Sequence, residues 1–252
     1  MKEHVRVRLA VIFWSFCLVV VLVTGIWMLG REFGKEHVRV QPHHFDIVAE
    51  NVLQKPGVDG FGVVCVQGDN IPVVCSYGSL YDNTPITLEG MADPILSIAV
   101  MWRVESGDIT LDEATSIVNS IALPEAYYID AMKMLGMNKT RLSSDCANGI
   151  ETTLTDMSMM ASALVGDNKL LSNYATKELL TSTFRWRGVN YESLLSAYTV
   201  EYCGGNAAII IDRENDVALI VVVDTATSMD EDMFAEICSK CSSVVCAKVL
   251  TE

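Results

Sequence analysis

Histidine and cysteine, which often carry nucleophilic or metal chemistry, are distributed unevenly along this chain. The four histidines, His4, His37, His43 and His44, all precede residue 45 of 252. A Ser-His-Asp or Cys-His arrangement needs an imidazole within hydrogen-bond reach of the nucleophile, and catalytic zinc commonly takes imidazole ligands. Either kind of site would require His43 or His44 to fold back onto the rest of the chain. The sequence therefore predicts no metal site and no cofactor.

Carboxylates are the other candidates for acid–base chemistry. Asp93, Asp145 and Glu151 can act together only if the fold brings them into one cleft and keeps one of them protonated. Acidic residues occur along the whole chain, with Lys+Arg 18 against Asp+Glu 32 and a net charge of −14. Ordinary surface acids are therefore the simpler interpretation. The same charge repels phosphate backbones, so nucleic acid is not an expected partner.

The cysteines offer one candidate disulfide. Of the eight, Cys17 lies in a long apolar run, which leaves an odd number that cannot all pair within one chain. Cys65 and Cys75 fall on two adjacent predicted strands and are the expected bridge. Cys238 and Cys241 form a single C-x-x-C without the second pair that a zinc site needs, so we expect buried thiols there.

Residues 9–30 form an apolar run without a charged side chain. At about 1.5 Å per residue, a helix of this length crosses a hydrocarbon layer of about 30 Å. The sequence therefore predicts a tail over 1–8, a transmembrane helix over 9–30, a linker over 31–43 and one domain over 44–252. We expect a single-pass protein that contacts lipid through this helix and lies mainly on the extracytoplasmic side. The bacterial plasma membrane is the expected location, with an organellar inner membrane as the alternative.

The domain has strands near both ends and a block of helices between them. The closing strands are apolar on both faces, which indicates a sheet covered on both sides. Hairpin-linked strands at both ends of the domain favour one antiparallel sheet, hence an α+β fold. The expected strands are 60–66, 71–77, 193–203, 206–213 and 216–224, and the expected helices are 45–53, 94–107, 124–135, 155–166, 173–184 and 229–250.

The segment GMADPILSIAVMWRVESGDITLDE, Gly90 to Glu113, contains a helix that is apolar on nearly every face. Helices of this kind are buried at the centre of a domain. Asp93 is a favoured N-cap residue and Pro94 a favoured first helical residue. The helix is therefore expected to begin at Pro94, with Asp93 as its N-cap.

Several stretches resemble the serine β-lactamase and penicillin-binding protein fold. The helix of Gly90–Glu113 resembles the one that follows the nucleophile in that family. PEAYYIDAMKMLGMNKTRL (Pro124–Leu142) resembles a family helix and its Leu-Gly-Met and Thr-Arg-Leu exit, and ETTLTDM (Glu151–Met157) resembles the Thr-Thr-x-x-Asp-Met segment. The resemblance implies a five-stranded antiparallel sheet flanked by N- and C-terminal helices. Since few residues separate LDEA from Pro124, the helical subdomain is expected to be reduced.

The family's first catalytic motif is absent. Its Ser-x-x-Lys supplies the nucleophile and the lysine that helps to deprotonate it, and these places fall at Gly90 and Asp93. None of the nine lysines has Ser or Thr three residues before it, so the absence does not depend on the register.

The other two motifs are also missing. The family's Lys-Thr-Gly provides positive charge for a substrate carboxylate, and its place falls near Leu195, Ser196 and Ala197. No Lys, Arg or His occurs between Arg187 and Arg213. Ser120 is a candidate remnant of the Ser-x-Asn element, although an ordinary helix serine explains it equally well.

The resemblance and the missing motifs together predict a catalytically inactive, membrane-anchored domain. We expect it to act as a binding or scaffolding subunit, with a protein partner in a membrane-associated complex. One alternative is an active acyl hydrolase with an unorthodox nucleophile such as Ser97, Ser196 or Cys203. The other is a ligand sensor that keeps an open cleft without turnover.

Overall fold

The computed structural model describes residues 40–88, 90–120, 124–144, 149–166, 169–181, 184, 187–191, 193–202, 205–213, 215–225 and 229–249. The chain divides into two compact units, Met1–Val38 and Arg39–Glu252, and all of these residues belong to the second. They form an α+β fold, as predicted. Its strands are β1 (Val58–Gln67), β2 (Val73–Gly78), β3 (Ile86–Leu88), β4 (Arg141–Leu142), β5 (Ile150–Thr152), β6 (Arg187–Tyr191), β7 (Ser193–Tyr202), β8 (Gly205–Asp212) and β9 (Val217–Thr225).

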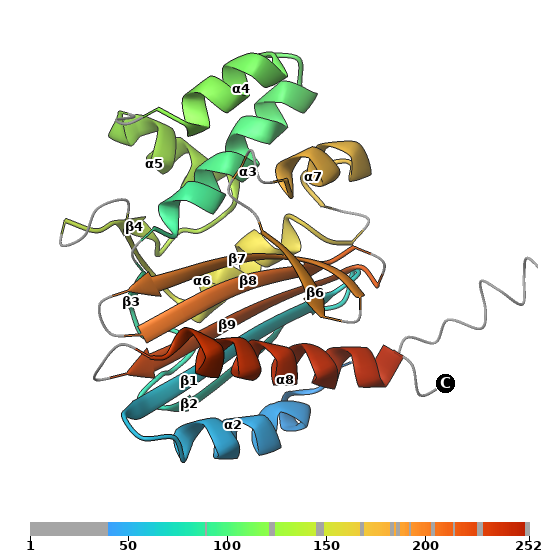
Figure 1. The fold of residues 1–252 in the computed structure, drawn as a ribbon. Helices are drawn as coiled ribbons and strands as arrows, with labels where there is room; N and C mark the ends of the chain where they lie inside the picture. The colour runs from blue at the N-terminus through green and yellow to red at the C-terminus, as the bar shows by residue number, and fades with distance from the viewer. Residues whose placement is uncertain are drawn as a thin grey trace, which may run out of the picture. The chain divides into compact units, whose positions relative to one another are not determined.

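Helices precede, interrupt and follow the strands (Figure 1). A short 3-10 turn, η1 (Pro42–Phe45), leads into the first of them. They are α2 (Asp46–Leu53), α3 (Ala92–Glu105), α4 (Leu111–Val118), α5 (Glu125–Met134), α6 (Leu154–Ser162), α7 (Asn173–Leu179) and α8 (Glu231–Val249).

The main sheet is antiparallel, with strand order β2-β1-β9-β8-β7-β6. Two of its internal strands, β1 and β9, come from opposite ends of the domain and pair from Val58↔Thr225 to Gln67↔Val217. In sequence, the whole helical block therefore lies between two strands that pair with each other in the sheet. The predicted union of the N-terminal hairpin with the closing strands is confirmed.

Alternate residues of the central strands enter two separate cores. Val64 of β1 and Ile209 of β8 pack with α3 to α7, whereas Val63 and Ile210 pack on the other face with α2 and α8. Figure 1 shows α2 and α8 on one side of the sheet and α6 on the other. The expectation of a sheet covered on both faces is confirmed, because both sets of side chains are almost completely buried.

The predicted fold class is wrong in two respects. The main sheet has six strands instead of five, because Arg187–Tyr191 adds β6 beyond β7. A second sheet of three short strands, β3-β5-β4, was not predicted. The predicted transmembrane helix over 9–30 lies outside the described residues, and no helix within them is long and apolar enough to cross a membrane.

The predicted Cys65–Cys75 disulfide is not formed, since both thiols are free and buried. The strand register explains this, because Cys65 pairs with Val73 and Cys75 pairs with Val63. The two cysteines are therefore diagonal neighbours, whose Cβ atoms lie roughly 7 Å apart, whereas a disulfide needs about 4 Å. Cys238 and Cys241 of α8 enter the same core as free buried thiols, as predicted.

Burial of these thiols makes the fold less stable at alkaline pH. It raises the pKa of Cys65 and of Cys238 from 9.0 to about 12. Between pH 9 and pH 12 the unfolded chain releases these protons while the folded chain keeps them, so the free energy of unfolding falls as pH rises. Each thiol contributes at most about 1.4 kcal/mol per pH unit.

We predict that Cys238→Ala makes this fall less steep, by up to about 1.4 kcal/mol per pH unit. Urea unfolding of the full chain between pH 7 and pH 10.5, under reducing conditions, measures the slope. Ser239→Ala, on the adjacent residue of α8, is the control and should keep the wild-type slope. Equal slopes for wild type and Cys238→Ala would contradict the prediction.

Candidate functional site

The position predicted to replace the family's nucleophile, Gly90, lies directly before α3. Its φ of +72° is left-handed, a conformation that glycine adopts without strain and that a serine would adopt at a cost. The preceding strand β3 ends at Leu88 and contacts β7. The start of α3 therefore lies beside the strand that carries the second predicted motif position.

Asp93 lies in the first turn of α3, but it is not the N-cap that the sequence predicted. The helix begins at Ala92 with Met91 as its N-cap. A carboxylate in the first turn is stabilised by the helix dipole. The first backbone N–H groups of a helix have no acceptor within it, so the missing N–H of Pro94 costs no hydrogen bond there. Asp93 and Pro94 thus favour the helix start, as predicted, from positions further inside it.

β7 is an internal strand at Leu195, Ser196 and Ala197. These residues pair with Val189, Gly188 and Arg187 of β6 on one side. On the other side they pair with Asp212, Ile211 and Ile210 of β8. An oxyanion site needs backbone N–H groups that are free to bind substrate. The backbone of β7 is paired along both edges at these positions.

The remaining described candidates, Ser120 and Glu151, each have a local partner. Ser120 directly follows the C-cap of α4, and its hydroxyl donates to the carbonyl of Ser116 at 2.9 Å. Glu151 forms an ion pair with Arg141 at 2.7 Å, and Asp145 lies outside the described residues. Within the part of the chain that the structure describes, no three His, Cys, Asp or Glu side chains are placed to hold a metal ion.

The Thr-Thr-x-x-Asp segment has a structural role. The Asp156 carboxylate is buried and accepts hydrogen bonds from the Lys139 backbone N–H and the Thr140 hydroxyl, both at 2.7 Å. Since Thr140 donates to Asp156, its hydroxyl accepts from that of Thr152 at 2.7 Å. Thr153 caps α6 by accepting from the Asp156 backbone N–H. This network joins α6 to the turn between α5 and β4.

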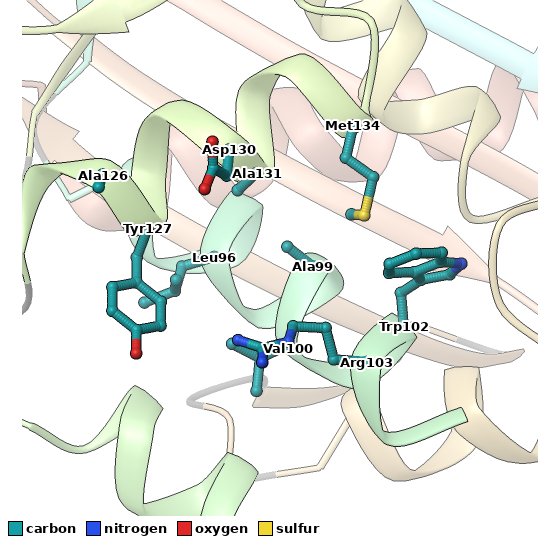
Figure 2. Close-up of a pocket in the computed structure, with 10 residues that line it drawn as sticks. All are labelled: Leu96, Ala99, Val100, Trp102, Arg103, Ala126, Tyr127, Asp130, Ala131 and Met134. Carbon is teal, nitrogen blue, oxygen red and sulfur yellow. The ribbon is translucent and has the colours of Figure 1, made fainter. Parts of the chain in front are cut away.

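A pocket of about 440 Å³ lies between α3 and α5, away from the start of α3. In Figure 2, Trp102 lies below Met134 at one end, Tyr127 lies beside Leu96 at the other, and Arg103 lies between them. Its volume is within the range of ligand pockets, roughly 300–1,000 Å³. Its lining also includes Ala99, Val100, Ala126, Asp130 and Ala131.

This pocket is suited to binding rather than to nucleophilic chemistry. Among the described residues, its lining contains no serine, threonine, cysteine, histidine or lysine. Trp102 and Tyr127 are partly exposed, at 36% and 37%, and offer aromatic surface to a ligand. Sequence analysis missed these residues, because Trp102 and Arg103 on α3 and Tyr127 on α5 meet only through packing and no sequence spacing joins them.

Comparisons with known proteins identify the fold. The sequence matches no protein-family profile and no curated protein sequence. The structure is similar to a β-lactamase/D-alanine carboxypeptidase from Yersinia pestis, with TM-score 0.58 and 13% identity over 82% of this chain and 98% of that chain. It is also similar to an octameric penicillin-binding protein homologue from Pyrococcus abyssi, with TM-score 0.60 and 10% identity over 81% and 77%.

A third similar structure is a class C β-lactamase from Rhodobacter sphaeroides, with TM-score 0.58 and 11% identity over 83% of this chain and all of that one. The chain therefore has the serine β-lactamase and penicillin-binding protein fold, as the sequence predicted. At these identities the likeness extends to the fold alone.

We predict that Asp156→Ala lowers the free energy of unfolding by roughly 3 kcal/mol. It leaves the Lys139 N–H and the Thr140 hydroxyl without their acceptor, and an unsatisfied buried donor costs about 1–3 kcal/mol. Urea unfolding followed by circular dichroism measures the change. Asp108→Ala, which removes an exposed carboxylate, is the control and should change stability by less than about 0.5 kcal/mol. Equal effects of the two substitutions would refute the role of this network.

Proposed function

We propose that this chain is a non-catalytic protein with the serine β-lactamase fold that acts by binding a protein partner. The start of α3 carries the proposal. Gly90 has no side chain to serve as a nucleophile, and Asp93 replaces the lysine that would help to deprotonate one. Without an activated nucleophile an acyl-enzyme does not form.

Two further observations support the absence of acyl transfer. Ser97, one of the alternative nucleophiles, is 1% exposed and its hydroxyl donates to the Asp93 carbonyl at 2.8 Å. Ser196 lies on β7, where it pairs with Gly188 of β6 on one side and with Ile211 of β8 on the other. Cys203 is outside the described residues.

The α3–α5 pocket supports binding of a protein. Trp, Tyr and Arg are the residue types that contribute most to protein–protein affinity, and Trp102, Tyr127 and Arg103 line this pocket together. The aliphatic floor suits an apolar side chain, and Arg103 and Asp130 offer charges beside it. The pocket thus fits an apolar side chain of a partner. The location predicted from residues 9–30 stays a prediction, and this proposal does not depend on it.

Intact-mass analysis tests the loss of catalysis. The full chain is incubated with a reactive penicillin and, separately, with a fluorophosphonate, beside an active serine β-lactamase as the positive control. We expect a covalent adduct on the control and none on this chain, because no nucleophile is activated. A stoichiometric adduct on this chain would overturn the proposal, and the modified residue would be the nucleophile.

Substitution of the pocket tests the binding role. Trp102→Ala should weaken partner binding by about thirtyfold or more, since truncating a central aromatic costs 2 kcal/mol or more. The matched control is Tyr174→Ala, which removes an aromatic side chain that is 69% exposed and outside the pocket.

The measurement begins with proteins that co-purify with the full chain from its own cells. A partner that binds wild type and Tyr174→Ala, but not Trp102→Ala, is then isolated and titrated calorimetrically against all three. Retention of every partner by Trp102→Ala would overturn the role of the pocket. A small molecule bound in place of a protein would favour the ligand-sensor alternative.

A further inference from the structure

A second pocket, where the end of α6, helix α7 and the β8–β9 turn meet, is basic in this acidic protein. Lys169, Lys177 and Arg213 line one space of about 220 Å³, although the chain carries a net charge of −14. Among the described residues, no carboxylate forms an ion pair with any of the three. Three cations that face one cavity without an ion-pair partner repel one another, and a bound anion relieves that repulsion.

An unsatisfied hydroxyl in the same pocket points independently to a ligand. Thr176 is 4% exposed, lines the pocket, and its hydroxyl oxygen has no hydrogen-bond partner. A buried polar group without a partner costs roughly 1–3 kcal/mol. Asn173 and Lys177 lie three residues before and one residue after Thr176 on α7, and both also line the pocket. A ligand oxygen that accepts from Thr176 is therefore in reach of an amide and an ammonium group.

The wall opposite α7 is held in place by the β8–β9 turn. Both Asp216 carboxylate oxygens accept from the Gly166 backbone N–H, at 3.2 and 3.1 Å, and the Asp216 carbonyl accepts from the Gly68 N–H at 2.8 Å. The approach is close, since a Cβ atom on Gly166 would lie 2.8 Å from the Gly68 carbonyl oxygen. Asp216 is the one acid in the described lining, so three cations against one carboxylate leave the pocket positive.

We propose that this pocket binds the phosphoryl group of a small soluble molecule. A phosphoryl group accepts hydrogen bonds on several oxygens, which matches one guanidinium, two ammonium groups, a hydroxyl and an amide. Guanidinium binds phosphate through paired N–H donors, and ammonium binds it as a point charge. Since a water molecule occupies about 30 Å³, a cavity of about 220 Å³ also holds a substituent on the phosphate. This site is separate from the α3–α5 pocket and does not rest on the proposed function.

Calorimetric titration of the full chain with inorganic phosphate tests the site, with chloride keeping the ionic strength constant. Wild type should bind phosphate, and Arg213→Gln should weaken the binding at least tenfold, because it removes a charge-assisted contact. The control is Lys133→Gln, which removes one exposed positive charge from α5 outside the pocket. No binding by wild type, or equal weakening by both substitutions, would overturn the proposal.

Thr176→Val separates binding from folding. Valine keeps the shape of threonine and removes the unpaired hydroxyl, so the ligand-free protein should melt at a higher temperature while phosphate binds more weakly. A purely structural threonine would not move these two readouts in opposite directions, and unchanged phosphate affinity would count against the site.

The source of the phosphoryl group is tested in parallel with glycerol phosphate and with phosphatidylcholine vesicles that contain phosphatidic acid. Binding of glycerol phosphate that Arg213→Gln weakens supports a soluble ligand. Binding to the vesicles, with no binding of inorganic phosphate or glycerol phosphate, would overturn the proposal of a soluble ligand.

Discussion

The fold depends on strands that are apolar on both faces. β1, β8 and β9 send alternate side chains into two cores, and neither set tolerates water, so both faces of the sheet must be covered. The chain meets this constraint with α2 and α8 on one face and the helical block on the other. Because β1 and β9 lie near opposite ends of the domain sequence and pair with each other, the segment that forms the helical block begins and ends at this sheet.

The same constraint explains the character of α3. Its first half lies in the core, with Ile95 and Ile98 completely buried. A helix held this firmly can present a precise catalytic group at its start, as the fold's enzymes require. Here the start is occupied by Gly90 in a left-handed conformation and by an acid that stabilises the helix. The first turn of α3 thus carries residues that favour the start of the helix.

The two proposed binding pockets differ in chemistry. The α3–α5 pocket offers Trp102 and Tyr127 around an aliphatic floor, which suits apolar surface. The pocket beside α7 offers positive charge and an unpaired hydroxyl, which suits an oxyanion. The Asp156 network, which joins α6 to the turn after α5, helps to fix the segments that carry both pockets.

Most of the fold followed from local pattern, because apolar periodicity and turn residues report directly on each element. The hairpin of β1 and β2, the buried helix α3, the paired closing strands and the long α8 were all predicted close to their observed bounds. The missing Ser-x-x-Lys was likewise a property of the sequence alone. Tertiary structure decided the rest. β6 has only five residues, of which Arg187, Gly188 and Asn190 are poor strand formers, so its pairing with β7 is what defines it as a strand.

The free Cys65 and Cys75 thiols depend on a register that composition does not reveal, since a shift of two residues decides whether two thiols face each other. Both pockets were invisible in the sequence for a related reason. Lys169 and Arg213, or Arg103 and Tyr127, are far apart along the chain, and only packing brings them to one cavity. By itself the sequence determined the layers of the domain and the absence of the catalytic motifs, because those depend on residue type and spacing. The tertiary structure decided where ligands can bind, because a pocket is a contact between distant segments.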